Sequence, residues 1–156
     1  QTELALSYLQ PTAGTLPPFA IWECDACSPQ PKEDQVELAG TLAFLGLVAP
    51  QRANAGDTVD VLTLWRVLAR PERPLSLMLH LQGADGVPIA VGDGLGFAVE
   101  QWQPGDLLVQ RHALTIPLET AAGTYIVQTG AYWLETLQPL NSNAPPEILA
   151  KSLVIK

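Results

Sequence analysis

The sequence predicts an all-β domain, namely a two-sheet immunoglobulin-like (Greek-key) sandwich with an irregular, Pro-rich N-terminal arm. Segments with apolar residues at every second position recur along the chain, which is the pattern of half-buried strands. Turn residues separate these segments, with 14 Pro and 12 Gly in total. No stretch of about a dozen residues keeps its apolar positions at helical spacing, so the helical crossovers of a parallel sheet are missing. A jelly roll would give much the same pattern, and the strand order therefore stays open.

The clearest strand is Leu75 to Gln82, in which leucines alternate with Ser, Met, His and Gln. The segment from Thr58 to Leu68 is the next clearest, because β-branched and aromatic residues there alternate with Asp60 and Arg66. A long strand is also expected from Val36 to Val48. Further strands are expected at residues 87–91, 107–116, 124–133 and 150–155.

Three turns that contain Gly each stand just before an expected strand: Ala55-Gly56-Asp57, Pro104-Gly105-Asp106 and Ala122-Gly123-Thr124. Glycine tolerates the positive φ that such turns need, and Asp or Thr can bond nearby backbone N–H groups. Tyr125 directly follows the last of these turns. This position is typical of the tyrosine corner of Greek-key sandwiches, in which the hydroxyl bonds to a neighbouring loop.

The chain of 156 residues is long enough for one domain with a sizeable core. We assign residues 35–156 to the β-sandwich and residues 1–34 to an arm or connector that contains many prolines. Phe19, Ile21 and Trp22 in this arm are large and apolar, so we expect the arm to pack on the sandwich.

Charge is sparse and mostly negative. The formal net charge is −8, and the eight Lys and Arg residues are scattered. Nucleic acid and anionic membrane surfaces both need clustered basic residues, so neither is an expected partner. No apolar run reaches the roughly 18 to 20 residues of a membrane span. Because hydrophobic residues make up 47% and charged residues 15%, we expect a partner, or the rest of a longer polypeptide, to cover part of the surface. A start at Gln1 instead of Met fits a fragment or a processed product.

Cys24 and Cys27 form a C-x2-C pair in the arm. A redox pair of this kind normally opens a helix, and no helix is expected behind it. A structural zinc site needs four ligands, and only the distant His80 and His112 could complete one. We therefore expect either a local disulfide or two unreactive thiols, and no metal.

No residues form a recognisable catalytic set. His80 and His112 both alternate with apolar neighbours, so we expect hydrogen-bonded structural side chains. A G-x-S-x-G nucleophile elbow is absent, and the Gly92-Asp93-Gly94-Leu95-Gly96 loop lacks the G-x-G-x-x-G spacing of a dinucleotide site. No cofactor is expected.

Loop acids are the next candidates for chemistry. Asp85, Asp93, Glu100 and Asp106 could surround a calcium ion or supply a glycosidase pair. The chain has no D-x-D-x-D-G run, and loop acids of an acidic protein are usually just solvated. Solvation is therefore the expected state.

The four tryptophans offer the remaining candidates for binding. Trp65 and Trp133 lie on expected strands and should pack in the core. Trp102 lies in a loop between Gln101 and Gln103. It is the candidate for an exposed ring that stacks on a sugar, with Asp85 and Asp93 as further ligand-binding residues. The alternative is that Trp102 closes the end of the sandwich.

Several segments, taken in order, resemble the β-sandwich domain found beyond the last membrane span of bacterial multi-span proteins of the dolichyl-phosphate-mannose mannosyltransferase type. The resemblance covers roughly residues 36 to 135 and consists mostly of turn and core residues. It implies an extracytoplasmic domain of the cell envelope, tethered to a membrane part that holds the catalytic site and is missing from this chain. The segments are Leu42-Ala43-Phe44-Leu45-Gly46, Ala55-Gly56-Asp57-Thr58-Val59, Leu62-Thr63-Leu64-Trp65-Arg66, Leu79-His80-Leu81, Trp102-Gln103-Pro104-Gly105-Asp106, His112-Ala113-Leu114 and Gly123-Thr124-Tyr125-Ile126-Val127.

The sequence departs from that family at two places. The family commonly carries an Asp shortly before its His-x-Leu segment, where this chain has Val109-Gln110-Arg111-His112. After the Tyr-Gly stretch it has an apolar residue and an acid, where this chain has Tyr132-Trp133-Leu134-Glu135. No ligand site is therefore transferred from the family.

Three functional hypotheses follow. The leading one is a non-catalytic accessory or interaction module of a larger envelope protein, whose partner is the membrane-embedded part of the parent chain. The alternative is a carbohydrate-binding module that uses Trp102 and the loops from Gly83 to Gly105. The third is a hydrolase built on Asp85, Asp93 and Asp106.

Overall fold

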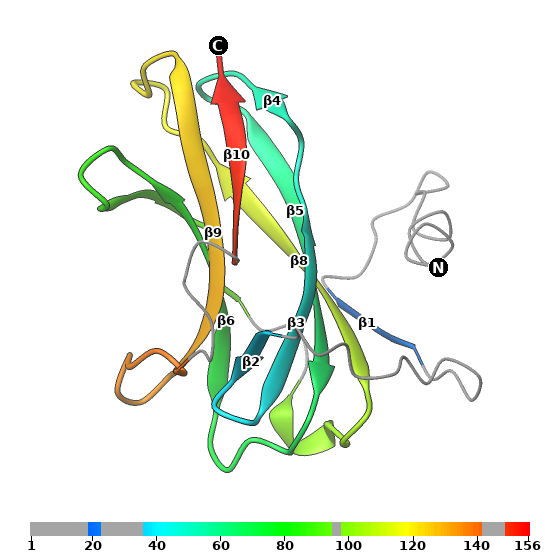
Figure 1. The fold of residues 1–156 in the computed structure, drawn as a ribbon. Coiled ribbons are helices and arrows are strands. Elements are labelled where there is room, and N and C mark those ends of the chain that lie inside the picture. Colours follow the sequence, from blue (N-terminus) through cyan, green and yellow to red (C-terminus); the bar gives the residue numbers. More distant parts are fainter. Residues whose placement is uncertain (1–18, 23–35, 95–97, 142–148) are drawn as a thin grey trace.

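The structure is a computed structural model that describes residues 19–22, 36–94, 98–141 and 149–156. These residues form two β-sheets that pack face to face (Figure 1). In this described part, the regular structure is strand apart from the 3-10 turn η1 (Val99–Gln101) and the 3-10 residue Leu149 just before β10. The prediction of an all-β, two-sheet sandwich is therefore confirmed.

Each sheet has five strands. Sheet A runs, from edge to edge, β1 (Phe19–Trp22), β8 (Leu107–Thr115), β5 (Thr58–Val67), β3 (Leu42–Val48) and β2 (Val36–Leu38). Sheet B runs β4 (Arg52–Ala53), β10 (Ala150–Ile155), β9 (Gly123–Trp133), β6 (Leu75–Gln82) and β7 (Pro88–Val91). All neighbouring strands are antiparallel except β4 and β10, which are parallel.

The chain crosses to sheet B for the two-residue strand β4 and returns to sheet A at β5, and it changes sheet again between β5 and β6, between β7 and β8, and between β8 and β9. In the immunoglobulin arrangement, strands A, B and E share one sheet and strands C, F and G share the other. The division here is the same, with β3, β5 and β8 in sheet A and β6, β9 and β10 in sheet B.

Two expectations about the first strands need correction. The single strand expected from Val36 to Val48 is a hairpin, because Ala39 and Gly40 both adopt positive φ (50° and 64°) and turn the chain between β2 and β3. Residues 19–22, which were assigned to the arm, form β1 and pair with β8 at the edge of sheet A. The arm therefore contributes a strand to the sandwich.

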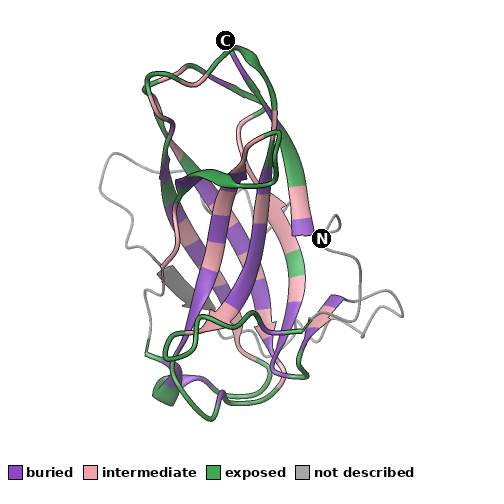
Figure 2. Ribbon diagram, turned by 90° about the vertical axis from the view of Figure 1, so that its left-hand side faces the viewer, coloured by how far each residue is buried: buried purple, intermediate pink, exposed green. Residues whose placement is uncertain are grey.

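The core is built mainly from alternate residues of the long strands β5, β6, β8 and β9, which face the opposite sheet (Figure 2). Trp65 is fully buried, as predicted, with its ring centroid 5.1 Å from that of Phe44. Trp133 is partly buried beside the same cluster, and the Arg73 guanidinium lies 4.5 Å from its ring centroid. Burial of large apolar side chains on both inner faces is the main stabilising contribution.

Two of the three turns with Gly behave as predicted, whereas Gly123, the first residue of β9, does not have positive φ. Gly56 and Gly105 have positive φ. The neighbouring carboxylates accept hydrogen bonds within their own turns, Asp57 Oδ2 from the Asn54 N–H at 2.8 Å and Asp106 Oδ2 from the Gln103 N–H at 2.8 Å. The Tyr125 hydroxyl donates to the Ala121 carbonyl at 2.9 Å, which is the bond expected of a tyrosine corner.

Candidate functional site

The residues that follow β7 continue to pair with β6. The Gly92 N–H donates to the Leu79 carbonyl at 2.8 Å, and the Gly94 N–H donates to the Leu77 carbonyl at 3.0 Å. Gly92 also passes close to β8, since a Cβ built on it would lie 3.2 Å from the Ala113 carbonyl oxygen. Gly92 therefore serves close backbone packing, and both histidines contact this segment.

The carboxylate of Asp93 is bound within the fold. Its Oδ1 accepts the Leu79 N–H at 2.7 Å, and both of its oxygens lie 3.2 Å from His80 Nε2. About a fifth of each of these two side chains is exposed. These contacts hold the Asp93 carboxylate against the edge of β6. They are structural contacts, and they do not favour the proposed ligand-binding role of Asp93.

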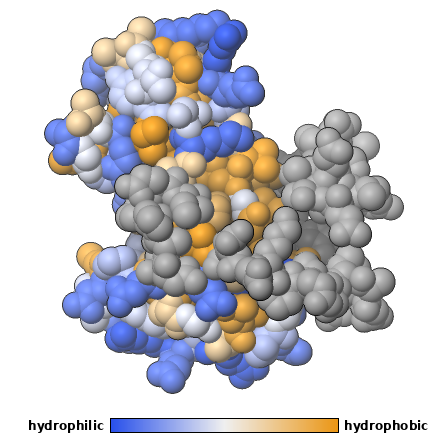
Figure 3. Space-filling view, viewed as in Figure 1, coloured by the Kyte–Doolittle hydropathy of each residue, from blue (hydrophilic) through white to orange (hydrophobic). Residues whose placement is uncertain are grey.

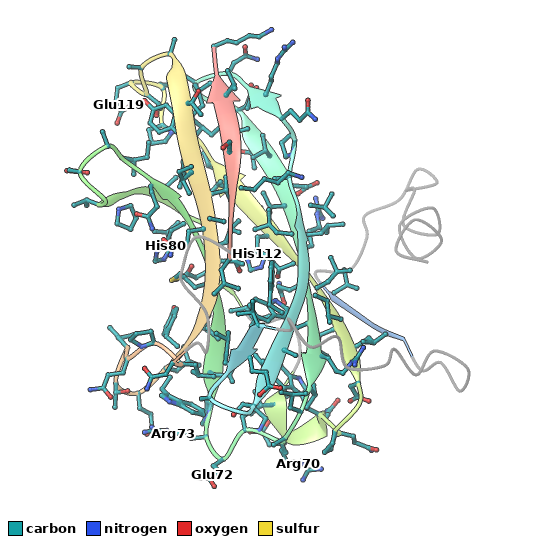
Figure 4. All side chains as sticks on the ribbon, in the orientation of Figure 1. Arg70, Glu72, Arg73, His80, His112 and Glu119 are labelled. Atoms are coloured by element: carbon teal, nitrogen blue, oxygen red, sulfur yellow. The ribbon has the colours of Figure 1, made fainter. Side chains whose placement is uncertain are left out.

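His112 lies between the two sheets in a chain of hydrogen bonds (Figure 4). Its Nδ1 is 2.8 Å from the Gly92 carbonyl, which can only accept, so Nδ1 carries the proton. Nε2 of the neutral ring then accepts from the Thr63 hydroxyl at 2.9 Å. The Thr63 oxygen in turn accepts the Trp65 Nε1–H at 2.9 Å. Every polar atom of this buried chain has a partner, and Thr63 is buried beyond the reach of a substrate.

Burial lowers the pKa of His112 from its ordinary 6.5, against smaller upward effects of the Gly92 hydrogen bond and the Asp93 charge. Between the lowered pKa and pH 6.5, the imidazole is therefore neutral in the folded state but protonated in the unfolded chain. We expect the contribution of His112 to stability to be fully present above about pH 6.5. It should fall as the pH drops below that value, with a slope approaching about 1.4 kcal/mol per pH unit.

Urea unfolding between pH 7.5 and 5 measures this dependence. The His112→Gln variant serves as the control, because carboxylates that titrate in acid affect both proteins equally. A wild-type slope between pH 6.5 and 5 that equals the slope of the variant would show that His112 is not held neutral.

The loop acids do not come together. Asp85 lies at the tip of the β6–β7 hairpin, where its Oδ1 accepts the Val87 N–H at 3.0 Å. Asp106 lies in the turn before β8, at the opposite end of the sandwich (Figure 1). Glu100 lies in η1. Within the described ranges, no three His, Cys, Asp or Glu residues gather where they could hold a metal ion. A site that joins Asp85, Asp93 and Asp106 is therefore not formed.

Trp102 has no exposed surface. It belongs to the core cluster that contains Trp65, and its backbone oxygen accepts the Arg70 Nε–H at 3.1 Å. The hypothesis of an exposed ring is therefore wrong, and burial supports the alternative that Trp102 closes the end of the sandwich. The polar neighbours Gln101 and Gln103 suggested an exposed loop, but these two residues face solvent while the ring between them is buried. Cys24 and Cys27 lie outside the described residues.

A cleft of about 970 Å³ lies between the β6–β7 hairpin and the β8–β9 loop. Asp85 stands on the hairpin side. Glu119, which is labelled in Figure 4, stands on the loop side. None of the lining residues is Lys or Arg. No sequence pattern indicates this cleft, because its two walls are distant in the chain. The lining consists of Gln82, Gly83, Ala84, Asp85, Ile89, Pro117, Glu119, Thr120, Ala121, Gly123, Thr124, Tyr125 and Ile126.

No protein-family model matches this chain, and a search of curated proteins found no significant match. Among the described residues, no helix is long and apolar enough to cross a membrane.

Proposed function

We propose that this chain is a non-catalytic interaction module of a larger envelope protein, with an immunoglobulin-like arrangement of strands. We further propose that it contacts the rest of its parent through the outer face of sheet B. The observation that carries this proposal is that β6, β7, β9 and β10 place no Lys, Arg, Asp or Glu on that face, where the one basic residue is Arg52 of the two-residue edge strand β4, beside Val154. The face consists of Ser76, Met78, His80, Gln82, Ile89, Val91, Thr124, Ile126, Gln128, Gly130, Tyr132, Ala150, Ser152 and Val154.

Apolar side chains on this face are open to solvent. The exposed fractions are 36% for Ile89, 57% for Val91, 41% for Ile126 and 37% for Val154. His80, the titratable imidazole of the face, is paired with Asp93. Contiguous low-polarity surface of this kind is typical of contact sites.

The outer face of sheet A differs in charge. It carries Asp60, Arg66 and Arg111, and Arg111 binds Asp60 through two hydrogen bonds of 2.9 and 2.8 Å. In the space-filling view, hydrophilic residues gather at the two ends of the molecule and apolar residues lie between them (Figure 3). A partner that is itself apolar would match sheet B better than either end.

The other parts of the proposal have different supports. The side chains best suited to chemistry, His80, His112 and Asp93, are bound to the fold itself, which favours a non-catalytic role. The envelope location and the membrane tether rest on the resemblance to the domain beyond the last membrane span. The carbohydrate-binding alternative depended on the ring of Trp102, and its burial removes that ring from the surface.

Met78 provides a direct test, because it is the single methionine of the sequence and its methyl group lies over Gly130 in the middle of this face. We expect hydroxyl radicals to oxidise Met78 at least about three times more slowly in the full-length parent than in the 156-residue chain. Leu45, on sheet A, should be labelled equally in both. Mass spectrometry of tryptic peptides gives the two rates. Equal oxidation of Met78 in both proteins would refute the proposed contact face, and a parent gene without membrane spans would refute the tether.

A further inference from the structure

The edge of sheet B just after β7 is held by side chains at a place where a regular ladder has backbone bonds. In an antiparallel pair, two opposite residues exchange both of their N–H to carbonyl bonds. Here the Gly92 N–H donates to the Leu79 carbonyl at 2.8 Å, but the Leu79 N–H donates to Asp93 Oδ1. The Gly92 carbonyl accepts from His112 Nδ1 instead. A carboxylate and an imidazole, both titratable, therefore replace one bond of the ladder.

His112 makes this attachment a link between the two sheets. Its ring comes from β8 of sheet A, whereas Gly92 continues β7 of sheet B. The neutral ring fits, because Nδ1 donates to Gly92 and Nε2 accepts from the Thr63 hydroxyl. A second proton on Nε2 would meet the hydroxyl proton of Thr63, whose oxygen already accepts from Trp65. Protonation thus charges a buried ring and breaks one of its hydrogen bonds.

The charges around His112 do not compensate for this. Among the described residues no Asp, Glu, Lys or Arg is buried, and Arg111 on the same strand is bound to Asp60 on the outer face. Asp93 is the charge that acts on the ring, but burial lowers the pKa of His112 more than Asp93 raises it. His80 contacts Asp93 from the outer face. Its protonation strengthens a pair that water reaches, which is a smaller effect than a charge buried between the sheets.

β7 can separate from the sandwich with little loss of apolar burial. Of its four residues only Ala90 is buried, whereas 36% of Ile89 and 57% of Val91 are exposed. In the described part of the chain, β7 pairs with β6 alone. A strand with one neighbour and little buried surface belongs to the least stable part of a fold.

We propose that residues 88–93 form an acid-sensitive latch, in which protonation of His112 releases β7 and the Gly92 carbonyl while the rest of the sandwich stays folded. The opening lets water hydrate the imidazolium. Ile89 and Val91 also belong to the outer face of sheet B. The latch therefore places that face under the control of pH, and this consequence rests on the proposed function, whereas the opening itself does not.

Amide hydrogen exchange of the 156-residue chain, followed by ¹H–¹⁵N NMR, tests the latch without the parent protein. We expect Gly92 to exchange through a local opening, so low concentrations of urea should leave its rate unchanged while they accelerate Leu64 in the centre of sheet A. After correction for the intrinsic effect of pH, the opening constant of Gly92 should rise about 5-fold from pH 7 to pH 5.5. Equal acceleration of Gly92 and Leu64 by urea, or an opening constant that does not change with pH, would overturn the latch. Neither result affects the Met78 experiment.

Two histidine variants assign the trigger. His112→Gln keeps a donor and an acceptor but cannot be protonated, so the opening of Gly92 should no longer depend on pH. His80→Gln is the matched control, because it removes the other imidazole that contacts this segment, and it should keep the 5-fold rise. A rise that persists in His112→Gln, or is lost in His80→Gln, would contradict the proposed trigger. One measurement needs no variant: a His112 ring signal that titrates at the ordinary 6.5 while Gly92 stays protected would also overturn the latch.

Discussion

Replacement of Trp102 by alanine should lower the free energy of unfolding by about 3 to 5 kcal/mol, which is the range for deletion of a fully buried indole. The ring has no exposed surface and lies in the cluster that contains Trp65, Leu42 and Leu75. Its removal leaves a cavity at the end of the sandwich, and the strands that meet there are too well packed to close it. Urea unfolding monitored by circular dichroism measures the loss.

Trp102→Phe separates the packing of the ring from the polarity of its nitrogen. Nε1 of Trp102 is buried without a hydrogen-bond partner, and phenylalanine removes this unsatisfied donor while it keeps most of the ring volume. Removal of the unsatisfied N–H stabilises the variant and offsets the cost of the small cavity. We therefore expect its free energy of unfolding to lie within about 1 kcal/mol of the wild-type value. A loss below about 1 kcal/mol in Trp102→Ala would contradict the core role and restore the ring as a surface feature.

The sequence predicted the features that depend on local pattern. Alternation from Leu75 to Gln82 identified both the strand and its inward face, because successive side chains of a strand point to opposite faces. Tyr125 was placed correctly from the turn before it. The hairpin between β2 and β3 was missed, because alternation runs on through Ala39 and Gly40 and only their positive φ breaks the strand.

The site depends on contacts between distant segments, which alternation does not encode. Asp85 and Glu119 stand on loops that belong to different connections, and only the packing of the two sheets brings them to one cleft. The partners of His112 come from β5 and from the segment after β7. The sequence predicted a hydrogen-bonded structural role for His112, but alternation could not indicate which donor and acceptor would meet its ring.

Replacement of Thr63 by valine should lower the free energy of unfolding by about 2 to 4 kcal/mol, although the two side chains have nearly the same shape. The Thr63 hydroxyl accepts from Trp65 Nε1 and donates to His112 Nε2, both at 2.9 Å. Valine leaves these two buried groups without partners, and each such group costs about 1 to 3 kcal/mol. The higher strand propensity of valine offsets only a small part of this loss. Urea unfolding at pH 7.5, where His112 is neutral, measures the effect.

Thr58→Val is the matched control, because Thr58 lies on the same strand and its hydroxyl bonds to Thr115 at 3.0 Å on the exposed face. Water replaces that bond when it is lost, so the stability should change by no more than about 0.5 kcal/mol. Thr63→Ser keeps the hydroxyl and loses only a methyl group, for which about 1 kcal/mol is expected. If Thr63→Val costs no more than Thr58→Val, the buried chain of hydrogen bonds does not stabilise the sandwich. If it costs the larger amount and Thr63→Ser does not, the hydroxyl stabilises sheet A through its bonds to Trp65 on its own strand and to His112 on β8, and His112 then has a structural role.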